Sequence, residues 1–139
     1  MKRMILLSVL FLFTACADKI NSSELHHLNG YWEIQKVVFP KGDTKEYNLN
    51  TTIDYITFED NKGYRKKVQP RLDGTFITSD DAASFRLIGT KGSFKLQYHN
   101  EFSEWEEQII ELSAEKLTVV NQENIRYYYK RHQTITAEK

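Results

Sequence analysis

Hydrophobic side chains recur at every second position along most of this 139-residue chain, from Gly30 to Arg131. The clearest segment is 93–99, in which Phe94, Leu96 and Tyr98 alternate with polar residues. Successive side chains of a β-strand point to opposite faces, so this spacing predicts strands with one buried and one solvated face. No segment after residue 28 has an extended helical period. The sequence therefore predicts an all-β fold.

Short runs with this alternation are separated by turn-forming residues such as Asp73-Gly74, Asp80-Asp81 and Lys91-Gly92. The polar segment 43–50 is interpreted as a loop. The expected strands span residues 32–38, 54–59, 64–68, 75–78, 84–88, 93–99, 105–112, 116–120 and 125–131. This spacing favours an up-and-down antiparallel β-barrel of eight to nine strands, because closure of the sheet removes exposed edges. A barrel of that size encloses packed side chains or one small ligand.

The first fifteen residues have the features of a secretory signal peptide. Lys2 and Arg3 precede an apolar run over residues 4–13, and the small residues Thr14 and Ala15 end the segment. Ten residues would span about 15 Å as a helix, which is half of a hydrocarbon core of about 30 Å. We therefore expect residues 1–15 to be a signal peptide that is removed.

Cys16 follows this segment and is the only cysteine of the chain. The sequence Phe13-Thr14-Ala15-Cys16 resembles the bacterial lipobox, in which the cysteine is lipidated and becomes the first residue after cleavage. The resemblance implies that Cys16 anchors the protein to a membrane; the alternative is an ordinary signal peptide beside an incidental cysteine. Ala17 lies where an aspartate would favour retention in the inner membrane. The expected location is therefore the cell envelope, on the outer membrane and facing the periplasm.

The remaining boundaries follow from composition. Residues 16–23 are interpreted as a polar, lipidated tether, and Ser22 or Ser23 can cap a short helical turn that ends at Leu28. The domain is expected over residues 24–131, and residues 132–139 form a C-terminal tail. His26 and His27 are adjacent, so their rings diverge on a helix and make a poor metal-chelating pair. We expect no metal site.

Charge and motif content exclude several classes of protein. The 19 basic and 19 acidic residues give a net charge of zero, which argues against a nucleic-acid partner. The chain contains none of the common nucleophile, phosphate-binding, dinucleotide-binding or zinc-protease motifs. We therefore expect a protein that is not an enzyme and that needs no cofactor.

Two charged runs have competing interpretations. Glu104 and Glu106 share one face of a strand, and we interpret them as a solvated outer face rather than an acid–base pair. The basic run 65–67 (Arg-Lys-Lys), with Arg71, is interpreted as a charged strand that resists edge pairing. The alternative for the basic run is contact with anionic lipid headgroups.

A resemblance to a known family arises at the first strand. A short helical turn followed by Gly30-Tyr31-Trp32 resembles the Gly-x-Trp signature of lipocalins, and segment 125–131 resembles the last strand of small bacterial lipocalin-like lipoproteins. The resemblance implies that Trp32 lies inside the closed end of a barrel, under a basic residue of the last strand. That residue is Arg131, or alternatively Lys130 or Arg126. The chain lacks the second lipocalin signature, Thr-Asp-Tyr, and the C-terminal helix of secreted lipocalins.

The same resemblance implies a function. We expect a small hydrophobic ligand to bind inside the barrel, and the alternative is an interaction module that holds a protein partner through its loops. Alternation places a set of side chains inside the barrel, as its core or as the lining of a ligand cavity. They are Trp32, Ile34, Phe94, Leu96, Tyr127 and Tyr129.

Overall fold

The computed structural model describes residues 19–133 of the chain. Within this range it contains nine strands and one short 3-10 helix. The elements are η1 (Ser22–Leu28), β1 (Gly30–Val38), β2 (Thr44–Glu46), β3 (Ile53–Glu59), β4 (Lys62–Pro70), β5 (Phe76–Thr90), β6 (Ser93–His99), β7 (Glu104–Leu112), β8 (Lys116–Asn121) and β9 (Arg126–Arg131). The sequence prediction of an all-β fold with a short N-terminal helix is confirmed.

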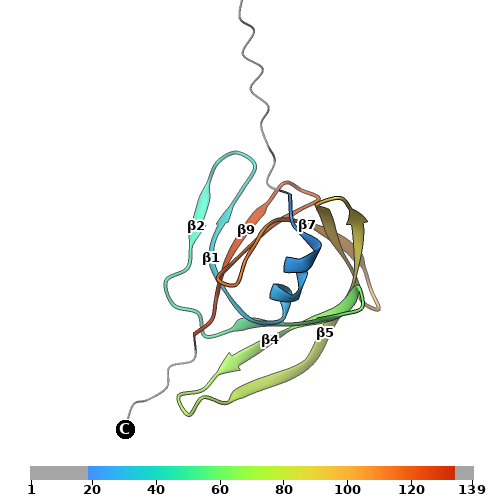
Figure 1. Cartoon of the computed structure of the whole chain (residues 1–139). Helices are drawn as coiled ribbons and strands as arrows, with labels where there is room; N and C mark the ends of the chain where they lie inside the picture. Colours follow the sequence, from blue (N-terminus) through green and yellow to red (C-terminus); the bar gives the residue numbers. More distant parts are fainter. Residues whose placement is uncertain (1–18, 134–139) are drawn as a thin grey trace, which may run out of the picture.

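The strands form a closed antiparallel barrel. Neighbours in sequence pair with one another from β3 to β9, and β1 closes the ring by pairing with both β3 and β9. β2 pairs with β1 alone, so eight strands form the ring and β2 extends it at one side. Figure 1 shows η1 within the outline of this ring, while the hairpin of β4 and β5 reaches away from it.

One end of the barrel is closed by η1 and filled by apolar side chains. Leu28 and Trp32 are both 0% exposed, and the indole Nε1 of Trp32 donates a hydrogen bond to the Leu28 carbonyl oxygen at 2.9 Å. Gly30 has a φ of +122°, and a Cβ there would lie 2.5 Å from Nη1 of Arg131. Position 30 therefore requires glycine, because its backbone angle disfavours other residues and because the Arg131 guanidinium occupies the space that a Cβ would need.

Two strand predictions were wrong. Segment 43–50 was expected to be a loop, but Thr44–Glu46 forms β2 against β1. Asp80-Asp81 was expected to be a turn between two strands, but β5 runs through it. Between the pairs Val68↔Thr78 and Lys66↔Ala82, β5 contains two more residues than β4, so the aspartates belong to a bulge in one continuous strand.

A second bulge changes the inward face of β1. The pairs Ile34↔Tyr129 and Lys36↔Tyr128 leave Gln35 without an opposite residue on β9. The alternation therefore shifts by one position, and Val37, rather than Val38, is buried at 6% exposure.

The folded part is longer than the sequence suggested. Ile20, placed in the tether 16–23, is 7% exposed within the core, and its amide donates to the Gly92 carbonyl oxygen at 3.0 Å. His132, placed in the tail 132–139, donates its amide to the Tyr31 carbonyl oxygen at 2.9 Å. The signal peptide 1–15 and Cys16 lie outside the described residues.

Candidate functional site

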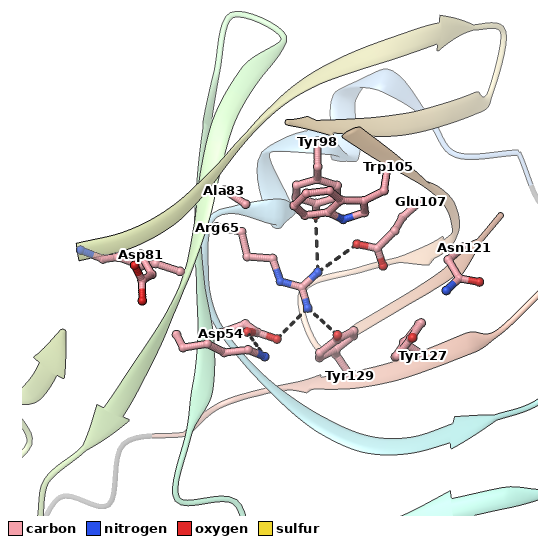
Figure 2. A pocket seen from close by; sticks show the side chains of 12 residues that line it. Asp54, Arg65, Asp81, Ala83, Tyr98, Trp105, Glu107, Asn121, Tyr127 and Tyr129 are labelled. Carbon is pink, nitrogen blue, oxygen red and sulfur yellow. Dashed lines mark hydrogen bonds and ion pairs between the residues drawn. The ribbon is translucent and has the colours of Figure 1, made fainter. Parts of the chain in front are cut away.

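A single arginine side chain, Arg65 of β4, occupies the interior of the barrel (Figure 2). Its Nη1 donates hydrogen bonds to Glu107 Oε1 at 3.1 Å and to the Tyr98 hydroxyl at 3.4 Å. Its Nη2 donates to Asp54 Oδ2 at 2.7 Å and to the Tyr129 hydroxyl at 2.5 Å. These acceptors belong to β3, β6, β7 and β9, so one guanidinium crosslinks the walls of the barrel.

Strand alternation and register place these polar groups inside. Asp54 lies two residues from Ile56 on β3, and Ile56 is 1% exposed within the core. Arg65 is the cross-strand partner of Ile56 and therefore shares its inward face. On β7, Glu107 lies two residues from Trp105, which packs against the core. Each charged residue thus occupies a position where the strand pattern calls for a core residue.

Mutual pairing keeps this cluster charged. Burial by itself would lower the pKa of Arg65, but the surrounding groups, Tyr129 and Asp54 foremost, raise it well above its ordinary value. Burial would raise the pKa of Asp54, yet Arg65 and Lys67 hold it below its ordinary value. The Lys67 ammonium lies 2.5 Å from Asp54 Oδ1. Burial raises the pKa of Tyr98 and of Tyr129, so both hydroxyls stay protonated at neutral pH.

A cavity of about 390 Å³ opens beside this cluster. Its walls combine aromatic rings with charged and amide groups, and Figure 2 shows Glu107, Tyr127 and Asn121 to one side of Arg65. The lining residues are Asp54, Arg65, Lys66, Lys67, Asp81, Ala83, Tyr98, Trp105, Glu107, Asn121, Tyr127 and Tyr129. A concave site with aromatic walls and a few convergent polar groups is typical of small-molecule binding.

A series of aromatic rings connects the core to this cavity. Phe85 and Tyr98 meet edge to face with ring centroids 5.4 Å apart. Tyr98 and Trp105 are stacked, with centroids 5.3 Å apart and an interplanar angle of 8°. Tyr98 is 1% exposed, whereas Trp105 is only partly buried. The indole of Trp105 is therefore held in one orientation at the wall of the cavity.

The six side chains predicted to be core or ligand-lining divide between the two ends of the barrel. Tyr127 and Tyr129 line the cavity. Trp32, Phe94 and Leu96 are buried in the hydrophobic core, and Ile34 packs against it.

The arrangement at Trp32 involves Arg131 rather than Lys130 or Arg126. The guanidinium carbon of Arg131 lies 3.9 Å from the centroid of the Trp32 ring. Its Nη1 donates to the Asn29 carbonyl oxygen at 2.6 Å, and its Nη2 donates to that of His27 at 2.7 Å. Arg131 thereby joins the last strand to η1 over the indole.

The interpretation of the basic run 65–67 was wrong for Arg65, which points inward instead of forming part of a charged outer strand. Lys66 does face outward, and its ammonium lies 5.8 Å from the ring centroids of both Tyr55 and Tyr64. The signal in the sequence was the inward alternation of Asp54 with Ile56, because a buried carboxylate requires a cation.

The acidic strand holds its buried carboxylate on the face opposite the one that Glu104 and Glu106 share. Glu104 is exposed and Glu106 is partly buried beside Lys95, at 3.9 Å. Glu107, on the other face, is 7% exposed and paired with Arg65. Its position two residues after Trp105 was the available indication.

Two further properties of residues 19–133 concern metal binding and the membrane. No group of three or more His, Cys, Asp or Glu side chains in this range is arranged to hold a metal ion. None of its helical segments is long and apolar enough to cross a membrane.

Comparison with a family model agrees with this architecture. Residues 28–119 match the family model described as a lipocalin-like domain. The chain is also similar to the crystal structure of a lipocalin-like protein from Bacteroides uniformis ATCC 8492, with 10% identity and a TM-score of 0.49 over 76% of this chain and 99% of that one. No curated protein matches it significantly. Because the family model covers more than half of the sequence, the chain belongs to the lipocalin-like domain family.

Proposed function

We propose that this protein is a non-catalytic lipoprotein of the bacterial cell envelope whose barrel binds a small, largely hydrophobic ligand. The observation that carries the ligand-binding part is the cavity of about 390 Å³ at the end of the barrel away from η1. Trp105, Tyr127 and Tyr129 supply its aromatic surface. The charged cluster around Arg65 forms its polar wall, so the ligand combines an aromatic or acyl part with a polar group.

A fluorescence titration of the unlipidated chain from Ala17 onward tests this proposal, since that chain contains the whole described fold. We expect saturable, micromolar quenching by an aromatic probe or by a fatty-acid probe. Tyr127→Ala should weaken binding about three- to tenfold, because an aromatic contact contributes about 0.5–1.5 kcal/mol.

Tyr128→Ala is the matched control. Tyr128 lies on the outer face of the same strand, where the Lys36 ammonium is 4.6 Å from its ring centroid. Its removal should leave the affinity unchanged. Absence of a saturable signal with both probes, up to their solubility limits, would contradict ligand binding.

The membrane anchor rests on the lone cysteine. In the proposed lipoprotein, Cys16 is acylated after removal of residues 1–15 and attaches the barrel to the outer membrane on its periplasmic side. Cys16→Ser should accumulate as an unprocessed precursor that incorporates no labelled fatty acid. Cleavage of that variant after Ala15, or absence of acyl label in the native protein, would contradict the anchor.

The interaction module is a second candidate because apolar side chains are exposed on loops. Leu49, Leu72 and Phe102 are 92%, 93% and 91% exposed. They lie in the connections that follow β2, β4 and β6. Leu49 and Leu72 line one groove with Phe76 and His132, whereas Phe102 and residues 80–84 form a separate surface. Photo-crosslinking from position 102 in intact cells should give one discrete protein adduct if this face holds a partner, with position 41 as control. A blank result at both positions would remove this candidate.

A further inference from the structure

The carboxylate of Glu107 in the cavity wall has one oxygen that is engaged and one that is not. Glu107 is 7% exposed, and its Oε1 is engaged by Arg65. Among residues 19–133 no group donates a hydrogen bond to Glu107 Oε2. That oxygen is not among the fully enclosed side-chain atoms that lack a partner, and Glu107 lines the cavity. The free oxygen is therefore open to a ligand in the cavity.

The cations that line the cavity are engaged by other groups, whereas one oxygen of Glu107 and the carboxylate of Asp81 are not. Arg65 binds Asp54 and Glu107, and Lys67 binds Asp54. The Lys66 ammonium lies over the rings of outward-facing tyrosines. Asp81 also lines the cavity, and no ion pair forms with it among the described residues. The lining contains three acidic and three basic side chains, so its formal charges balance, and what it offers to a cation is the unengaged carboxylate oxygens of Glu107 and Asp81.

An anionic headgroup would be disfavoured by this arrangement. Both terminal nitrogens of Arg65 already donate to protein acceptors, two bonds each. A ligand carboxylate that took over the terminal nitrogens of Arg65 would displace Glu107 or Asp54, and a displaced Glu107 would lose the ion pair that it forms with Arg65. Leaving one partner of a buried ion pair unpaired is strongly unfavourable.

We propose that the ligand of this cavity is a small aromatic cation, such as a protonated amine attached to a ring system. Its ammonium group donates to Glu107 Oε2, and its ring contacts Trp105 and Tyr127. This proposal rests on the ligand-binding function proposed above and specifies the class of ligand.

The test is a comparison of three probes that share one ring and differ in charge: naphthylmethylammonium, naphthamide and naphthoate. Each is titrated against the unlipidated chain from Ala17 while tryptophan fluorescence is followed. We expect the ammonium probe to bind at least about tenfold more tightly than the naphthoate, as for a hydrogen bond to a charged group. Trp105→Phe should remove most of the signal, because Trp32 is 0% exposed in the closed end.

Glu107→Gln keeps the size of the side chain and removes its charge, so it should abolish the preference for the ammonium probe. Glu106→Gln, the neighbouring substitution on the other face of β7, should retain that preference. If Glu107→Gln fails to fold, the relative affinities of the three probes for the unmodified chain still test whether the cavity prefers a cation. Naphthoate or naphthamide binding as tightly as the ammonium probe would overturn the cationic ligand and leave ligand binding intact. Absence of saturable binding by all three probes would overturn both.

Discussion

At the residue scale, Arg65 determines the character of the barrel interior. A buried ion pair does not by itself stabilise a fold, since removing two charges from water costs several kcal/mol per ion. Here the guanidinium donates to two carboxylates and two tyrosine hydroxyls, so each of its two terminal nitrogens makes two hydrogen bonds. The cluster fixes the relative positions of five strands and leaves Glu107 with one free oxygen.

Removing the arginine should be costly because buried Glu107 loses its counter-ion and buried Asp54 loses one of two cations. We expect Arg65→Met to lower the free energy of unfolding by about 3–5 kcal/mol in chemical denaturation. Arg71→Met, at an exposed position after β4, should change it by less than about 0.5 kcal/mol. Equal denaturation midpoints for the two variants would show that the Arg65 cluster contributes little to folding.

Asp54 should make stability depend on acid pH. Its pKa in the folded state is held below the ordinary value of 3.8 by Arg65 and Lys67, so the unfolded chain binds the proton first as the pH falls. The stabilisation is therefore present above about pH 4 and is lost as the pH falls through the folded-state pKa.

The measurement is the slope of unfolding free energy against pH between about 5 and 2. Asp54→Asn should have a shallower slope than the unmodified chain, whatever its absolute stability. Asp80→Asn, at an exposed position, should keep the original slope. Parallel curves for the unmodified chain and Asp54→Asn would refute a charged Asp54 in the folded state.

At the scale of elements, Arg131 connects β9, η1 and the turn after β7. Besides its contacts to η1 and Trp32, its Nε donates to the Ala114 carbonyl oxygen at 2.8 Å. Arg131→Lys keeps the charge but not the planar fork, so we expect a loss of about 1–3 kcal/mol and faster hydrogen exchange in η1. Lys130→Arg, at the exposed neighbouring position, is the control. Unchanged exchange in η1 would mean that Arg131 does not hold the helix in place.

The strands could be predicted because alternation is a local property. Phe94, Leu96 and Tyr98 follow it without interruption, and all three are buried. Bulges are not local in this sense: the one at Gln35 depends on the register with β9, about ninety residues away in sequence. That is why the burial of Val37 could not be predicted from its own strand.

The candidate site was only partly accessible from sequence for a similar reason. Tyr127 and Tyr129 were placed inside by their alternation with Tyr128. Arg65 lies in a basic run that resembles a solvated strand. Its inward orientation is favourable only because Asp54 and Glu107 pair with the buried guanidinium. Those partners lie 11 and 42 residues away along the chain. The pairing with Asp54 follows from the register between β3 and β4, and the pairing with Glu107 from the curvature of the sheet into a barrel, so neither is visible as a short motif.

At the scale of the whole molecule, the barrel has two dissimilar halves. The half around η1 is an apolar plug centred on Trp32, with Arg131 over the indole. The other half contains the Arg65 cluster and the cavity beside Trp105. Each half contains one of the two tryptophans of the chain, which provides a probe of each.

The proposed ligand binds in the half of the barrel that contains Trp105. An NMR titration of the isotope-labelled chain from Ala17, using the tightest-binding naphthalene probe, follows the two indole N–H signals separately. We expect the Trp105 signal to shift with saturation while that of Trp32, which donates to the Leu28 carbonyl oxygen inside the plug, stays in place. A shift of the Trp32 signal alone, or of neither signal, would contradict the assignment of this cavity as the binding site.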